Sequence, residues 1–209
     1  MEDVLHLYSL AYDEKRPVVC FGEMPVQLLG EVVAPPEVKK GTPRREDYEY
    51  ARGGVGVLLV AFEPLTGWRL VETSRRRTKA DYCRFMHRVA GMFPQAEKVA
   101  LVQDNLNTHN ASSFYENLPA EQAFSPAQRF EMHYTPKKGS WLNMAELELS
   151  ALSRICLARR IPSAEVLDRE VQAIVKERNE SQVKVGWQFS VTQAREKLSR
   201  HYENAKSKN

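Results

Sequence analysis

The segment Val99-Ala-Leu-Val-Gln-Asp104 places an acidic side chain directly after a compact apolar strand, and the polar turn Asn105–His109 follows it. In open α/β sheets, ligands bind outside the carboxyl ends of the strands, so Asp104 is predicted to face a cleft. The plainer interpretation is that Asp104 caps the turn or the next helix, as Asp and Asn often do. Taken alone, the segment slightly favours this local role.

Strand patterns dominate the part of the chain before this segment. We expect strands at residues 17–21, 26–29, 55–62 and 68–73. The turn residues Pro64–Gly67 separate the last two, which predicts a hairpin. The Pro-rich and Lys/Arg-rich stretch Pro35–Arg45 is expected to be an exposed loop.

Helical patterns dominate the rest. We expect helices at 79–92, 112–118, 143–157, from 163 onward and at 192–202, and a strand at 130–134. Met144, Leu147, Ala151, Leu152 and Ile155 share the apolar face expected for the third helix. The first half of the chain is mostly strands, and the second half mixes helices and strands. This order predicts an α/β fold in which a mixed central sheet, antiparallel in its first half, has helices on both faces.

Composition fits one domain. The chain has 209 residues, 43% of them hydrophobic and 27% charged, enough for a single sizeable core. We expect a domain at 17–203, an N-terminal extension at 1–16 and a frayed tail at 204–209. No signal peptide or membrane span is apparent, which indicates a cytoplasmic protein. Cys20, Cys83 and Cys156 are expected to be reduced, buried and structural.

A second acid, Glu146, lies at the start of the expected helix 143–157. One interpretation is local: with Asn143 as N-cap, Glu146 occupies the N3 position of a capping box. The other is that the helix presents Glu146 toward Asp104, while Glu148, two residues on, faces elsewhere. Two such carboxylates would bind Mg²⁺ or Mn²⁺. A pair of these ions can assist displacement at phosphorus, which usually needs a further bridging carboxylate.

Basic residues form short clusters, although the formal net charge is only +3. Any one cluster is most simply a solvated surface. If they converge around the acids, they could hold a phosphate backbone. The candidates for DNA contact are Arg75, Arg76, Arg77, Lys79, Lys137 and Lys138, with Arg159-Arg160 as a further cluster.

Several motifs together resemble the catalytic domain of IS630-type transposases, relatives of the Tc1/mariner group. They are residues 17–31 (PVVCFGEMPVQLLGE), 48–54 (YEYARGG), 61–69 (AFEPLTGWR), 76–79 (RRTK), 101–109 (LVQDNLNTH) and 133–146 (HYTPKKGSWLNMAE). The resemblance covers residues 17 to 203. It implies a ribonuclease H-like fold and a DDE site, in which two Asp and one Glu hold two divalent ions for DNA strand cleavage and strand transfer.

Carried over by position, the resemblance makes Asp104 the second acid and Glu146 the third. The first belongs at Gly22, because the family pattern reads Asp-Glu where this chain reads Gly22-Glu23. Glycine offers no ligand. Glu23 points to the opposite face of a strand unless a bulge turns it inward. Asp47 and Asp81 lie in other segments, and nothing in the sequence places either at the site.

The resemblance also implies partners: transposon-end and target DNA, a possible homodimer, and no membrane. The family's upstream helix-turn-helix region is not expected here, because sixteen residues before Pro17 are too few for it. The sequence therefore predicts a nucleoid-associated bacterial DDE transposase domain of an insertion sequence, impaired by Gly22. The alternative is a non-catalytic remnant that binds DNA or dimerises.

Overall fold

The computed structural model describes residues 1–32, 41, 49–137 and 139–199. Their centre is a five-stranded sheet in the order β3-β2-β1-β4-β5. The elements β1 (Val18–Glu31), β2 (Tyr50–Glu63) and β3 (Trp68–Ser74) are antiparallel neighbours. The short strands β4 (Val99–Gln103) and β5 (Phe130–Tyr134) continue the sheet in parallel with β1.

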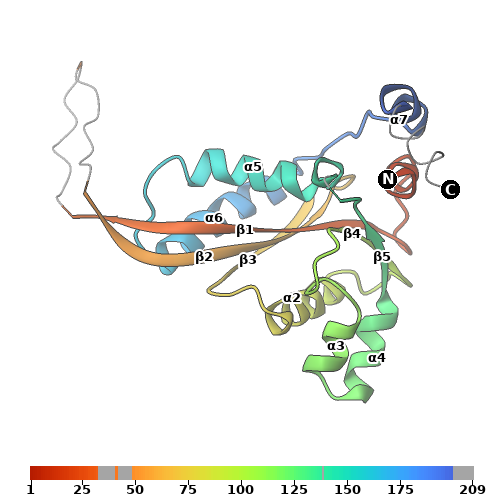
Figure 1. Cartoon of the computed structure of the whole chain (residues 1–209), viewed down its shortest axis with the longest axis horizontal. Coiled ribbons are helices and arrows are strands. Elements are labelled where there is room, and N and C mark those ends of the chain that lie inside the picture. Colours follow the sequence, from red (N-terminus) through yellow and green to blue (C-terminus); the bar gives the residue numbers. More distant parts are fainter. Residues whose placement is uncertain (33–40, 42–48, 138, 200–209) are drawn as a thin grey trace.

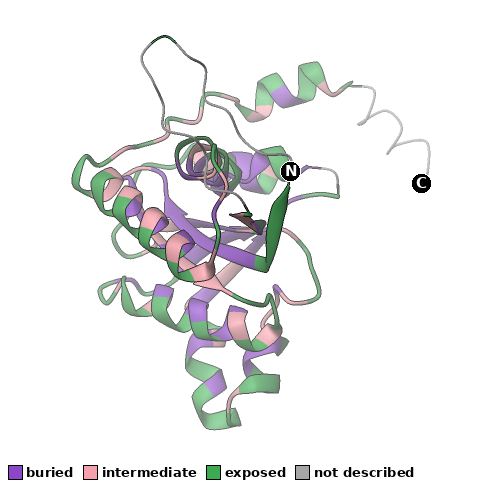
Figure 2. Ribbon diagram, turned by 90° about the vertical axis from the view of Figure 1, so that its left-hand side faces the viewer, coloured by how far each residue is buried: buried purple, intermediate pink, exposed green. Residues whose placement is uncertain are grey.

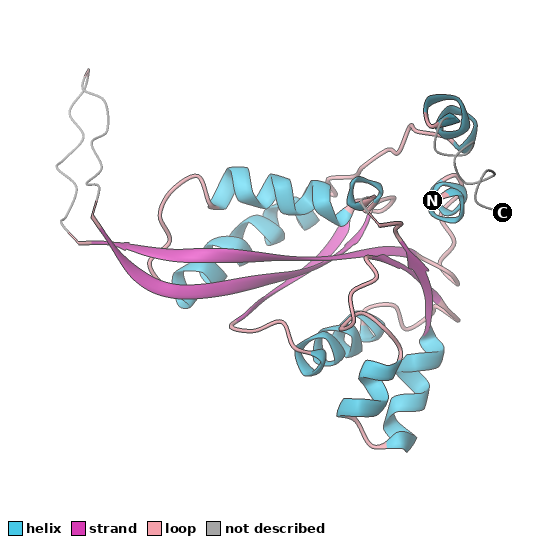
Figure 3. Cartoon of the chain, viewed as in Figure 1, coloured by secondary structure: helices cyan, strands magenta, loops and turns pink. Residues whose placement is uncertain are grey.

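Helices cover both faces of this sheet (Figures 1 and 3). One face carries α2 (Lys79–Gly91), α3 (Ser112–Asn117) and α4 (Ala120–Arg129). The other carries α5 (Ala145–Cys156) and α6 (Ala164–Glu180), and the short 3₁₀ helix η1 (Ser140–Leu142) leads into α5. The predicted fold class, a mixed sheet with an antiparallel first half between helices, is confirmed.

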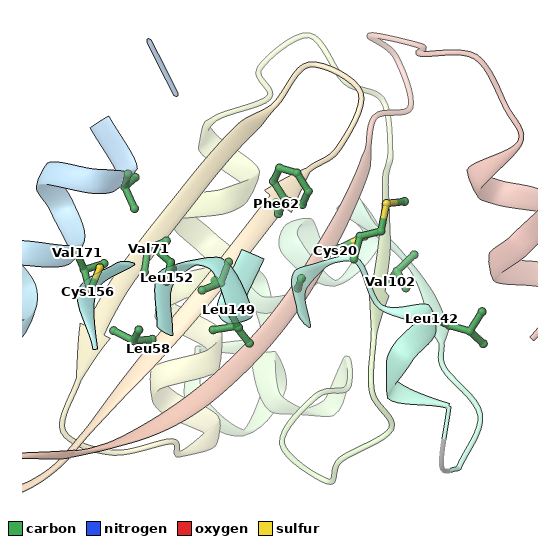
Figure 4. Packing of buried hydrophobic residues seen from close by; sticks show 14 of the residues in the cluster. Cys20, Leu58, Phe62, Val71, Val102, Leu142, Leu149, Leu152, Cys156 and Val171 are labelled. Carbon is green, nitrogen blue, oxygen red and sulfur yellow. The ribbon is translucent and has the colours of Figure 1, made fainter. Parts of the chain in front are cut away.

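The strands bury both of their faces because they separate two hydrophobic cores (Figure 2). Successive side chains on a strand point to opposite faces, so Cys20 joins the core under α5 and α6 while Phe21 joins the core under α2 to α4. Figure 4 shows part of the first core, where Leu149 and Leu152 of α5 lie over the sheet. Cys20, Cys83 and Cys156 are buried and free, as expected.

Two further helices lie beside the β5 end of the molecule (Figure 1). The first, α1 (Glu2–Tyr8), buries Val4, Leu5 and Leu7 in the core on the α5 side. It contacts the second, α7 (Val191–Lys197), and a two-pronged ion pair between Arg195 and Glu2 joins them. Residues ahead of the predicted domain therefore contribute to its core.

Three local predictions were wrong. The two extended pieces at 17–21 and 26–29 are one continuous strand, β1, because β2 pairs with it along its length. The helix α4 was not predicted. The expected apolar face of α5 was partly wrong: Met144 and Leu152 are buried as predicted, but Leu147 and Ile155 are exposed. The other buried residues of the helix are Ala145, Glu148, Leu149 and Cys156.

Other predictions concern residues outside those described: the loop 35–45 apart from Gly41, Asp47, Lys138 and the tail 204–209. The hairpin between β2 and β3 is confirmed, and Gly67 in its turn has a φ of 81°, which glycine adopts without strain. Among the described helices, none combines the length and the apolar character that crossing a bilayer requires.

Candidate active site

Asp104 comes directly after β4, and β4 pairs in parallel with the part of β1 that leads to Gly22. In the parallel pair β1 and β4, Val18 lies opposite Ala100 and Cys20 opposite Val102. Gly22 and Asp104 each lie two residues beyond the last of these pairs. Cys20 belongs to the core on the α5 side, so the alternation of β1 directs position 22 toward that same side.

Position 22 faces the first turn of α5. A Cβ atom added to Gly22 would lie 3.0 Å from the Cβ of Ala145 and 3.1 Å from Cδ1 of Leu149. Asn143, just before the helix, fixes this approach because its Nδ2 donates to the carbonyl of Phe21 at 2.7 Å. The helix turn that carries Glu146 is therefore tied to the strand that carries Gly22.

Glu146 is an exposed residue on this turn, and its side chain makes no hydrogen bond or ion pair with any other residue that the structure describes. The capping-box interpretation is half right: Oδ1 of Asn143 accepts from the N–H of Ala145 at 3.1 Å, but the N–H of Asn143 donates to the carbonyl of Ser140 and not to Glu146. Partial burial of the carboxyl group, and then the negative charge of Asp104, raise the pKa of Glu146. The two acids are thus close enough to repel each other.

Asp104 does not cap the following turn. Its Oδ1 accepts a hydrogen bond from Nδ1 of His109, five residues on, and its side chain is 45% exposed. Sequence reasoning assigned His109 no role, although it closes the motif Asp104–His109. Burial lowers the pKa of His109, but hydrogen bonds to Asp104 and Glu23 outweigh burial and raise the pKa to about 8.

Glu23 lies on the other face of β1, as strand alternation predicts. Its carboxylate contacts Nη1 of Arg77 at 3.4 Å and Nε2 of His109 at 3.4 Å. The register shift between β1 and β2 occurs between Leu28 and Leu29, so no bulge there turns Glu23 toward Gly22. A shallow cavity of about 350 Å³ lies beside this contact, lined by Glu23, Arg77 and residues 105–108.

Glu148 points elsewhere, as its spacing from Glu146 predicts. It is buried between two arginines: Nε of Arg69 lies 2.9 Å from Oε1, and Nη2 of Arg178 lies 2.9 Å from Oε2. Arg69 also donates to the carbonyl of Val183 at 2.5 Å. This carboxylate has a structural role.

The basic candidates are divided among separate acids. Arg75 lies 3.8 Å from Glu165, Lys79 pairs with Glu116 at 2.7 Å, and Arg77 pairs with Glu23. Arg76 and Lys137 are exposed, and Arg159 and Arg160 pair with Glu170 and Glu31. Asp81 completes the capping box of α2 with Thr78, so it belongs to the helix end. Exposed pairs of this kind are individually weak and leave the cations free to exchange partners.

The donor set suits a divalent ion only in part. Within the described ranges, no group of three or more His, Cys, Asp or Glu side chains could hold a metal ion. Asp104 and Glu146 supply carboxylate oxygens, the ligands of Mg²⁺ and Mn²⁺; His109 pairs with Asp104, whereas the Glu146 carboxylate has no cationic partner among the described residues. Position 22 is a glycine and offers no ligand.

The family described as DDE superfamily endonuclease matches residues 17–168, and the chain belongs to this family. A solved structure shares its fold. The structure titled "Crystal structure of the Mos1 Strand Transfer Complex" aligns with a TM-score of 0.52 and 16% identity, over 87% of this chain and 58% of that one. The structure titled "Crystal structure of the Mos1 mariner paired end complex with Mn" aligns with a TM-score of 0.46 and 17% identity, over 87% and 59%.

The chain therefore spans less than two thirds of these solved relatives. A search of curated protein sequences gave no match.

Proposed function

We propose that this chain is the catalytic domain, residues 17–203, of an IS630-type insertion-sequence transposase, with Asp104 and Glu146 as surviving ligands of a DDE site. One observation carries the proposal. The negative charge of Asp104 raises the pKa of Glu146 although the two residues come from distant segments, and Gly22, where the resemblance puts the first acid, packs against Ala145 in the helix turn that carries Glu146. The free Oδ2 of Asp104 and the Glu146 carboxylate, which has no cationic partner among the described residues, fit a cation that arrives from solution.

The oxygen donors of Asp104 and Glu146 would hold Mg²⁺ or Mn²⁺. When bound, such ions activate the attacking oxygen and stabilise the leaving oxygen in displacement at phosphorus. The chain's own contribution is placement. The 2.7 Å bond from Asn143 to β1 fixes the start of α5, and the bond from His109 restrains the Asp104 carboxylate.

Gly22 is expected to impair this function severely, because the loss of one ligand leaves the ions poorly placed for in-line displacement. The test is nicking of a supercoiled plasmid in Mn²⁺ by the chain as it stands and by Gly22→Asp. We expect nicking above background from the variant alone. Gly22→Asn is the matched control, since it adds a similar volume without the charge. Equal nicking by the chain and by Gly22→Asp would contradict the proposal.

The second candidate function is a non-catalytic domain that binds DNA or pairs with another copy, which Gly22 and the exposed arginines favour. The similar Mos1 structure is that of a strand transfer complex, which supports DNA as the partner in this candidate function. DNA affinity that falls steeply with salt, without nicking by Gly22→Asp, would favour this candidate. Affinity independent of salt would exclude phosphate contacts.

A further inference from the structure

His109 lies between two acids that come from different parts of the chain. Its Nδ1 is hydrogen-bonded to Asp104, and its Nε2 lies 3.4 Å from Oε2 of Glu23, 86 residues earlier. The residue is only 2% exposed. Its ring packs edge-on against Phe21, with ring centroids 4.9 Å apart, and stacks on Tyr82 at 5.2 Å. Aromatic contacts on two sides thus fix the plane of the imidazole.

The backbone of His109 is held as firmly as its ring. Its N–H donates to the carbonyl of Leu106 at 2.9 Å. Its carbonyl accepts from Nε2 of Gln103 at 2.9 Å and from the hydroxyl of Tyr134 at 3.2 Å. Gln103 and Tyr134 end β4 and β5, so the histidine is attached directly to the sheet.

Asp104, by contrast, has a half-exposed side chain at the start of an exposed turn. Within the described part of the chain, His109 is the hydrogen-bond partner of its carboxylate, through Oδ1 alone. Without that bond, the side chain could rotate freely in solvent. Partners that orient a ligand in this way commonly change metal affinity by about 10–100-fold when they are removed.

We propose that His109 is a positioning residue for Asp104: a buried donor that fixes Oδ1 and leaves Oδ2 available for a divalent ion, while Glu23 holds the far side of the ring. This inference rests on the proposed function, because it gives Asp104 the role of a metal ligand. Glu23, next to Gly22, then supports His109 and does not replace the missing metal ligand.

The test compares two substitutions of the full chain in the Gly22→Asp background. His109→Asn can present an N–H near the position of Nδ1, whereas His109→Gln places its amide near the position of Nε2. We measure the dissociation constant of Mn²⁺ from the electron paramagnetic resonance signal of the free ion. We expect His109→Gln to weaken binding about tenfold and His109→Asn to remain within about threefold of the parent. Urea unfolding of each variant shows whether it is folded.

A second readout needs no metal. Long-range ¹H–¹⁵N correlation spectra of the unsubstituted chain report which imidazole nitrogen carries a proton. We expect a proton on Nδ1, since a carboxylate can only accept. An unprotonated Nδ1 would overturn the inference, and this result holds even if both His109 variants fail to fold.

The outcomes separate the two proposals. If Asp104→Asn abolishes Mn²⁺ binding while His109→Gln and His109→Asn both match the parent, the positioning role is wrong and the metal site stands. If Asp104→Asn and Glu146→Gln leave Mn²⁺ binding unchanged, the metal site is wrong and the positioning role falls with it.

Discussion

Glu146 and Glu148 lie two residues apart on α5, in opposite electrostatic surroundings. Glu148 is buried and has an arginine within 2.9 Å of each carboxylate oxygen. Glu146 is exposed, has no cation from the described part of the chain beside it, and has a pKa raised partly by another acid. The chain thus neutralises the carboxylate that stabilises the fold and leaves unneutralised the one proposed to act.

This difference separates two kinds of acidic residue within one helix turn. A buried charge without a partner is costly, so Glu148 requires Arg69 and Arg178 in the folded state. A ligand for a divalent ion must keep its oxygens free, and Glu146 does so at the cost of repulsion from Asp104. Variants at the two positions should therefore behave in opposite ways.

The largest expected effect is the loss of stability in Glu148→Gln. Removing this charge leaves the buried Arg69 without its counterion, and breaking such a pair typically costs about 3–5 kcal/mol. Unfolding in urea measures the change, with Glu146→Gln as the matched control on the same helix. A loss of less than about 1 kcal/mol would show that Arg69 finds another partner and would remove the contrast between the two glutamates.

An intermediate effect is expected where β1 meets the turn that carries both glutamates. A Cβ at position 22 would lie 3.0 Å from the Cβ of Ala145, so Gly22→Ala should cost about 1–3 kcal/mol through overpacking. Combined with Ala145→Gly, it should cost less than the sum of the two single variants. Strict additivity in this double-mutant cycle would mean that α5 does not press on β1 at this point.

The smallest expected effect concerns the charge on Glu146. Because its folded pKa is raised, the unfolded state ionises first, and ionisation lowers stability as pH rises from the unfolded pKa through the folded one. Glu146→Gln should therefore be more stable than the parent at pH 7, by under about 1 kcal/mol because the site is solvent-screened. The difference should vanish below about pH 4, where the carboxyl is protonated in both states. A parent that is the more stable at pH 7 would contradict the repulsion.

The order of elements was predictable from local patterns, because hairpin turns, strands and helices depend on residues that are close together in the sequence. Which residues of α5 are buried was not fully predictable in this way. Apolar character assigned Leu147 and Ile155 to the core, yet both are exposed, and Glu148 is buried through Arg69 on β3 and Arg178 on α6. The residues around Glu148 in the sequence do not indicate that arginines from two other elements will pair with it.

The site shows the same limit. Asp104, Glu146 and position 22 were proposed from motifs, and strand alternation correctly set Glu23 on the other face. His109 was not identified as a site residue, since its importance depends on Glu23, 86 residues away in sequence. A histidine at the end of the motif Asp104–His109 was the one available signal.

The central claim is that positions 22, 104 and 146 together form one divalent-metal site. The most direct measurement is a crystal structure of the Gly22→Asp variant with Mn²⁺, using the anomalous scattering of the metal to locate it. The account predicts anomalous density in contact with carboxylate oxygens of Asp104, of Glu146 and of the side chain introduced at position 22. Density bound elsewhere on the molecule, with these three carboxylates left without metal, would contradict it.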